Sequence, residues 1–211
     1  MSFFLMTMPA AAFLIAATCP EPTPIRLRVG GRVGEIEIGT AFDLARLREL
    51  SGHYGRKAKH IPFGFYASQI SGETAVTIGN DRQDVCAGPI EIAVTIELAE
   101  RHIQIGRDLR DDNCQFNAAL KHYQLHAEAD VAVLRHYVAV VTQTLAQAPL
   151  AGIFGAAGKV DSRGGSSFAP AVQAFIEPVL DEMRAEQASA IDAVDTPIEI
   201  RRLEQACHGQ L

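Results

Sequence analysis

The chain has 211 residues, of which 48% are apolar and 21% are charged, a composition typical of one globular domain with a sizeable core. Its formal net charge is -6, and its Lys and Arg residues are scattered, which argues against the basic surface of proteins that bind nucleic acids or anionic membranes. We therefore expect no nucleic acid among its partners. We expect instead a protein or peptide partner of unknown identity.

The first 18 residues contain no Lys or Arg and end in the small residues Ala16, Ala17 and Thr18. A short apolar run before small residues is typical of a signal peptide, and this run is shorter than the roughly 20 apolar residues that span a membrane. We predict a signal peptide at residues 1–18, a single domain at 19–211, and a periplasmic or secreted protein with no membrane span in its mature chain. An uncleaved membrane anchor is the alternative.

Export would place the four cysteines in an oxidising compartment, where they form disulfide bonds. We favour a Cys86–Cys114 pair, because both residues flank the same predicted pair of strands. Cys19 and Cys207 would then tie the two termini together. Buried thiols without a partner are the alternative.

Alternation of apolar and polar residues predicts the strands of the first half. Residues 25–29 and 33–38, separated by Gly30 and Gly31, are predicted to form a β-hairpin. A short capped helix from Thr40 and a polar surface loop follow. Further strands are expected at 63–70, 75–78, 90–98 and 102–105, with a turn at 99–101. These strands predict an antiparallel sheet.

The second half has helical periodicity. Asp112 and Gln115 form a capping-box-like start, and neither Pro nor Gly interrupts residues 113–148. A Gly- and Ser-rich stretch at 152–167 predicts a mobile loop, and helices at 169–188 and from Pro197 to about 207 follow. The expected fold is therefore α+β, an antiparallel β-sheet packed against a long central helix, with C-terminal helices on the other side of that helix.

His122 and His126 carry the strongest chemical signal in the sequence. They lie four positions apart in the predicted long helix, so both imidazoles face the same side about one turn apart, which lets one zinc ion bind both nitrogens. In zinc proteases the residue after the first His is a Glu that acts as general base. Here it is Tyr123, and a phenol is a poor proton acceptor at neutral pH.

A zinc site needs a third ligand from another element. His136 is ten residues from His126, about 15 Å along a helix, which is too far to share the metal. Candidates on the next helix are Glu177, Glu182 and Glu186. Asp130, four residues beyond His126, could orient that imidazole through its second nitrogen.

The segment from Cys114 to His126, preceded by two predicted strands, resembles small exported bacterial proteins described as zinc-dependent proteases of the zincin-like type. In that family a Cys precedes a His-Glu-x-x-His helix by a similar interval, and an upstream Cys, similar in place to Cys86, introduces the strands. The likeness covers about residues 55–136. It implies zinc as cofactor, with His122 and His126 as ligands and no catalytic Glu.

The expected function is that of an exported zincin-like protein, a catalytically degenerate metallopeptidase homologue that either retains zinc at His122 and His126 or has lost it. One alternative is an active zinc metalloprotease with another base, for which Glu128 and Asp130 are candidates. The other is a non-enzymatic binding or scaffold protein of the cell envelope, in which the His pair is incidental.

Overall fold

The computed structural model of the protein describes residues 24–53, 63–79, 88–150 and 168–207. The strands are β1 (Arg26–Val33), β2 (Ile36–Gly39), β3 (Gly64–Gly79) and β4 (Gly88–Ile105), and the helices are α1 (Leu44–His53), α2 (Asn113–Gln147), α4 (Phe168–Val194) and α5 (Pro197–Gln205), with a 3-10 turn at Arg107–Leu109. The predicted signal peptide, the predicted loop at 152–167, Cys19 and Cys86 lie outside these ranges.

The sheet is centred on β4, and its strands run in mixed directions. β1 and β2 pair with one edge of β4 in parallel, whereas β3 pairs with the other edge antiparallel. The predicted antiparallel sheet is therefore wrong, and the fold is mixed α/β. Side-chain alternation shows which residues share a face of a sheet, but it does not specify the direction of the neighbouring strand.

The predicted hairpin at residues 25–38 is also wrong. β1 and β2 keep one register along β4, from Arg26 opposite Glu91 to Gly39 opposite Gln104, so they form one interrupted edge. Gly31 continues β1 because helix α2 approaches closely there. A Cβ atom on Gly31 would lie 3.1 Å from Cγ2 of Val138, tighter than ordinary packing.

β4 continues through residues 99–101, where a turn was expected. Glu100 has a positive φ of 47°, and the pairing with β3 shifts register between Ala67 and Gln69. The extra residue makes a β-bulge, which reverses the side-chain alternation. Leu98 is buried before the bulge and Arg101 after it, so the bulge turns the Arg101 side chain towards the interior.

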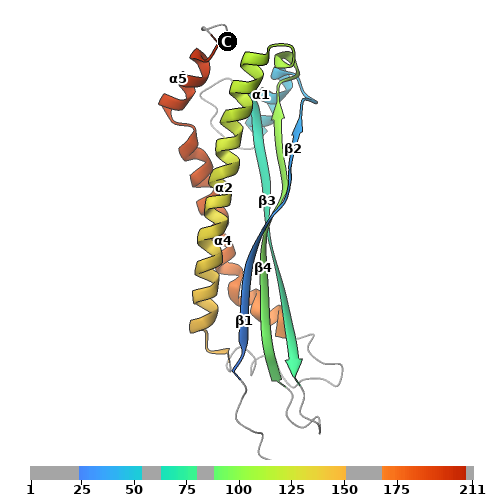
Figure 1. Cartoon of the computed structure of the whole chain (residues 1–211), viewed down its shortest axis with the longest axis vertical. Coiled ribbons are helices and arrows are strands. Elements are labelled where there is room, and N and C mark those ends of the chain that lie inside the picture. The colour runs from blue at the N-terminus through green and yellow to red at the C-terminus, as the bar shows by residue number, and fades with distance from the viewer. Residues whose placement is uncertain (1–23, 54–62, 80–87, 151–167, 208–211) are drawn as a thin grey trace, which may run out of the picture.

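Helices α2 and α4 pack together and cover one face of the sheet (Figure 1), α2 over β1 and β4, and α4 over β3. α2 begins where predicted, because the Asp112 carboxylate accepts hydrogen bonds from the backbone N–H groups of Cys114 and Gln115. None of the helices in the described ranges has the length and apolarity needed to cross a bilayer.

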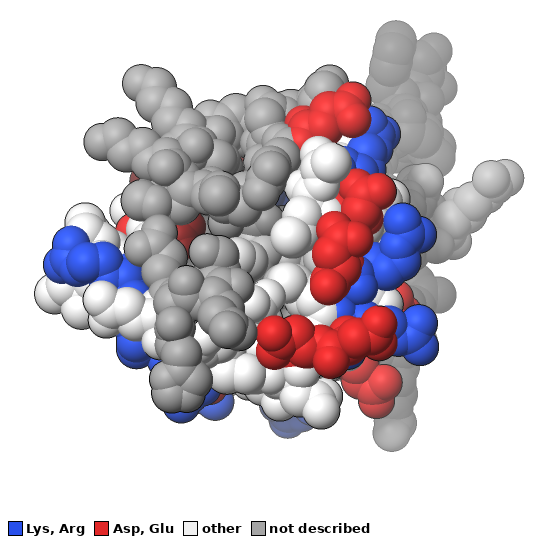
Figure 2. All heavy atoms as spheres, turned by 90° about the horizontal axis from the view of Figure 1, so that it is seen from above, with Lys and Arg blue, Asp and Glu red and all other residues white. Residues whose placement is uncertain are grey.

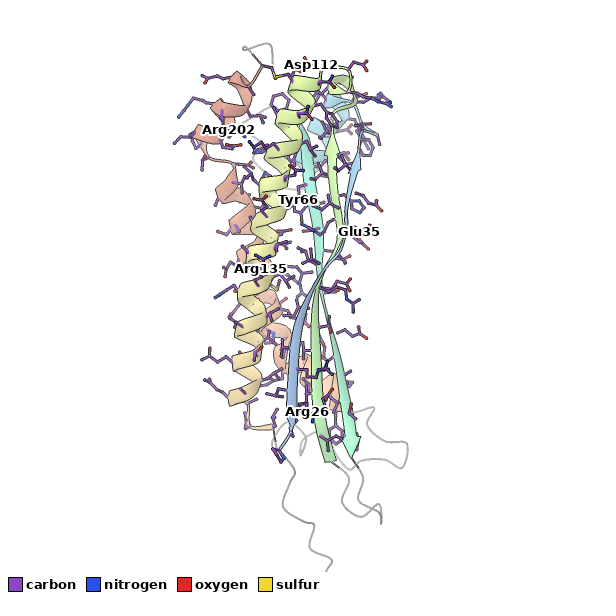
Figure 3. The ribbon with its side chains drawn as sticks, viewed as in Figure 1. Arg26, Glu35, Tyr66, Asp112, Arg135 and Arg202 are labelled. Atoms are coloured by element: carbon purple, nitrogen blue, oxygen red, sulfur yellow. A yellow bond between two sulfur atoms is a disulfide. The ribbon has the colours of Figure 1, made fainter. Side chains whose placement is uncertain are left out.

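A disulfide joins Cys114, in the first turn of α2, to Cys207, just after α5. The predicted Cys86–Cys114 pair and the predicted link between Cys19 and Cys207 are therefore both wrong. The two bonded residues are separated by 93 positions, and α5 returns to the end of the molecule where α2 begins (Figures 1 and 3). The spacing of the cysteines in the sequence does not indicate that α5 returns to this end of the molecule.

The same end of the molecule is seen in Figure 2, where rows of acidic side chains are flanked by basic ones. Arg107, just after β4, lies 3.5 Å from Asp43, just before α1. On this face the charges of opposite sign are interspersed, which agrees with the absence of a basic patch in the sequence.

The apolar core consists of two separate clusters. The larger one includes Leu98 on β4 and Leu134 on α2. The smaller one, towards the start of α2, includes Ile103 on β4 and Tyr123 on α2. The boundary between the two clusters is marked by a buried charged residue in each element, Arg101 on β4 and Asp130 on α2.

Five polar residues at this boundary form what we call the polar belt: Tyr66 and Ser68 on β3, Arg101 on β4, Asp130 on α2 and Gln187 on α4. The hydroxyl of Tyr66, between the sheet and α2 (Figure 3), donates to Oδ2 of Asp130 at 2.7 Å and accepts from Arg101 at 3.3 Å. Ser68 and Gln187 also donate to Oδ2 of Asp130, at 2.5 and 3.1 Å. Tyr66 thus bridges two buried residues of opposite charge.

Candidate metal centre

His122 and His126 lie on the buried side of α2 and are 5% and 1% exposed. Their neighbour from another element is Asp195, which follows the last residue of α4 and precedes Thr196, the N-cap of α5. The three side chains form a group that could hold a metal ion. The third member is thus Asp195, at the turn between α4 and α5, and none of the glutamates expected from the sequence.

The three facing atoms form a nearly equilateral triangle. Oδ1 of Asp195 lies 3.1 Å from Nε2 of His122 and 3.1 Å from Nε2 of His126, and the two nitrogens are 3.2 Å apart. A tetrahedral zinc ion with bonds of about 2.0 to 2.1 Å separates its ligands by about 3.3 Å. The donor atoms are therefore already spaced as one face of such a coordination shell.

The carboxylate of Asp195 is held in its charged form. Burial raises its pKa, but the hydrogen bonds and charges of His122 and His126 lower it more, so the pKa lies well below its usual range. The Asp195 side chain is 39% exposed, so the group is open to solvent on this side. An ionised oxygen beside two imidazole nitrogens is a typical ligand set for a divalent transition metal.

A second carboxylate supports His122 from behind. Oε1 of Glu199, in the first turn of α5, lies 3.4 Å from Nδ1 of His122, the nitrogen that faces away from Asp195. Arg202 donates to both oxygens of Glu199, at 2.7 and 2.5 Å. This pairing with Arg202 is the main reason that the pKa of Glu199 is lowered. A carboxylate behind a metal-binding His fixes its tautomer and orientation.

Tyr123 is buried beside the two imidazoles. Its ring stacks on His126 with centroids 5.7 Å apart, and its hydroxyl donates to the backbone oxygen of Gly64 at 2.6 Å. The space around Gly64 is tight, since a Cβ there would lie 2.8 Å from the Tyr123 ring. Tyr123 is thus a packed core residue that joins α2 to the start of β3.

Glu128 and Asp130, the two alternative general bases, lie in different surroundings. Glu128 is exposed and lines a groove beside β2, together with Ile36 and Arg135. Asp130 is buried in the polar belt, one helical turn beyond His126.

No family of proteins, curated protein or solved structure matches this chain. The function is therefore inferred from the geometry of the described residues.

Sequence reasoning found the His pair but missed Asp195 and Glu199. Thr196 and Pro197 did predict the start of a helix, and the Thr196 hydroxyl accepts from the backbone N–H of Glu199 as an N-cap should. The residues around Thr196 and Pro197 do not indicate that α5 lies against α2, because His122 and Glu199 are 77 positions apart in the sequence.

Proposed function

We propose that this chain is an exported zinc-binding protein, a zincin-like protein without peptidase activity. The supporting observation is the triangle of donor atoms from His122, His126 and Asp195, whose edges of 3.1 to 3.2 Å suit one zinc ion. Two His and one carboxylate are a common protein ligand set for zinc, with a fourth position for water.

The proposed role of the zinc is to fasten the end of α4 and the start of α5 to α2. Asp195 lies where the chain leaves α4, and Glu199 lies in the first turn of α5. The Cys114–Cys207 bond fastens the other end of α5. A metal at His122 and His126 would therefore join two segments that the disulfide already holds near each other.

The surroundings of the site favour a structural zinc over hydrolysis. A metal-bound water needs a base whose pKa is close to the working pH. The Tyr123 hydroxyl is bonded to Gly64, and the pKa of Glu199 is lowered by Arg202, which makes this carboxylate a weaker base. Asp130 already accepts three hydrogen bonds on one oxygen.

Export is supported by the disulfide, because such bonds persist mainly in oxidising compartments. We place the protein in the periplasm or outside the cell. A signal peptide at residues 1–18 is part of this proposal, and mass spectrometry of the protein purified from the periplasm tests it. A mature N-terminus after residue 18 is expected, and an intact N-terminus would contradict cleavage.

The metal is tested by elemental mass spectrometry on protein purified without a histidine tag. About one zinc per chain is expected, and His122→Ala, His126→Ala and Asp195→Ala should each lose it. His136→Ala is the matched control, since His136 is exposed on the same helix. A wild-type protein that binds no metal after incubation with zinc would overturn the proposal and leave a scaffold domain.

The absence of peptidase activity is tested on the zinc-loaded protein with unstructured protein substrates. We expect no hydrolysis from the wild type, and none from Tyr123→Glu, because the ring position is enclosed next to Gly64. Hydrolysis by the wild type that a chelator abolishes and zinc restores would instead establish an active metalloprotease.

A further inference from the structure

Two buried polar atoms one helical turn apart have no hydrogen-bond partner in the described structure. They are Nδ1 of His126 and Oδ1 of Asp130, and both residues are 1% exposed. A buried polar atom without a partner is destabilising, so two such atoms on one face of α2 need an explanation. One is a nitrogen that can donate, and the other is an oxygen that can only accept.

The helix places the two side chains on one face of α2. Residues at i and i+4 lie on the same face, and the Cα–Cβ bonds tilt towards the N-terminus, so the Asp130 side chain leans back over the turn that carries His126. The other oxygen of Asp130 is held by Tyr66, Ser68 and Gln187. The polar belt therefore fixes the carboxylate and leaves Oδ1 available.

The opposite nitrogen of His126 belongs to the proposed metal site. Nε2 faces Asp195 and His122 at 3.1 and 3.2 Å. A metal bound through Nε2 requires the remaining proton of a neutral imidazole to be on Nδ1. His122 already has a carboxylate behind its Nδ1, that of Glu199, whereas no residue in the described ranges makes the equivalent contact with His126.

We infer that Asp130 is a positioning residue for the metal site, whose Oδ1 accepts the Nδ1–H of His126. The inference rests on the proposed metal site and gives the polar belt a role in it. The belt anchors Asp130 to β3, β4 and α4, Asp130 holds the His126 ring, and His126 presents Nε2 to the metal. Arg101 reaches the belt because of the bulge in β4.

The substitution Asp130→Asn tests this inference with an unusually specific expected result. The position of Oδ2 receives three donors, so the amide oxygen should take that position and the amide nitrogen the position of Oδ1. The amide would then donate a hydrogen bond where the carboxylate accepted one. Nδ1 of His126 must lose its proton to accept it, and the proton moves to Nε2, where it opposes metal binding.

The measurement is nitrogen-15 NMR of the His126 ring in metal-free protein, which reports whether Nδ1 is protonated. We expect a protonated Nδ1 in the wild type and an unprotonated Nδ1 in Asp130→Asn. Zinc affinity, measured by competition with a chelating dye, should fall about 10- to 100-fold in that variant. The matched control is Asp181→Asn, the same substitution at an exposed carboxylate of α4 that pairs with Arg184, which should leave Nδ1 of His126 protonated.

The two readouts separate this inference from the proposed function. If the wild type binds no zinc, the metal proposal fails while the NMR result still decides whether Asp130 holds His126. A wild-type His126 without a proton on Nδ1 would overturn the inference, even if Asp130→Asn does not fold. An unchanged ring protonation and a zinc affinity within twofold of wild type in Asp130→Asn would overturn it as well.

Discussion

The substitution Tyr66→Phe removes the hydroxyl that bridges Arg101 and Asp130 while keeping the ring in the core. The hydroxyl donates to Asp130 at 2.7 Å and accepts from Arg101 at 3.3 Å. Burial raises the pKa of Tyr66, so this group remains a protonated donor at neutral pH. Its loss therefore affects two charged and buried side chains together.

The size of the expected destabilisation depends on which hydrogen bonds Asp130 and Arg101 retain in the variant. Asp130 retains the donors Ser68 and Gln187, and Arg101 retains the backbone oxygens of Gly34 and Ala127. A hydrogen bond to a charged group contributes about 1.5 to 3 kcal/mol, and the longer contact contributes less. We expect the free energy of unfolding to fall by about 2 to 4 kcal/mol.

The assay is urea unfolding followed by circular dichroism, since the chain contains no Trp, with a chelator present so that metal binding does not contribute. The matched control is Tyr123→Phe, which loses the uncharged hydrogen bond to the oxygen of Gly64. It should cost about 0.5 to 1.5 kcal/mol. A loss below about 0.5 kcal/mol for Tyr66→Phe, or a loss no larger than the control's, would refute the bridging role.

Three further outcomes are expected. The double variant Cys114→Ser/Cys207→Ser should lose up to about 4.7 kcal/mol of unfolding free energy by the loop-entropy relation, because the bond closes a loop of 93 positions; a loss below 1 kcal/mol in urea unfolding would contradict this. Gly64→Ala should cost more than about 3 kcal/mol, because its Cβ would lie 2.0 Å from the backbone oxygen of Gln104; a wild-type melting temperature would exclude this clash. Zinc at 100 times its dissociation constant should add about 2.7 kcal/mol of stability, or about 5 to 10 °C in melting temperature; Asp195→Ala should show no such increase in a thermal scan.

Local features of the sequence predicted the helix starts well. Asp112 begins α2, and Thr196 with Pro197 begins α5. The four-residue spacing of His122 and His126 correctly predicted that both side chains share one face of a helix. Each of these features depends on groups within about one turn of each other, which the backbone geometry of a helix fixes by itself.

Other sequence features were ambiguous, because a glycine or a break in alternation can mark either a turn or an irregular point within a continuing strand. Gly30 and Gly31 predicted a turn, yet Gly31 continues β1 because Val138 and Leu134 leave little space for a Cβ. Residues 99–101 also predicted a turn, yet they contain the bulge at Glu100. A glycine or a break in alternation shows that the backbone is unusual at that point, and the packing partner decides how.

The sequence by itself determined where the helices begin, which residues face the core, and which histidines can act together. The tertiary structure alone decided the strand directions, the Cys114–Cys207 pairing, the position of Asp195 and the polar belt. Many of these contacts join residues far apart in the sequence, such as Asp130 with Gln187, 57 positions apart, and Ser68 with Gln187, 119 positions apart. They depend on how complete helices and strands pack, because side-chain periodicity specifies a buried face but not the element that covers it.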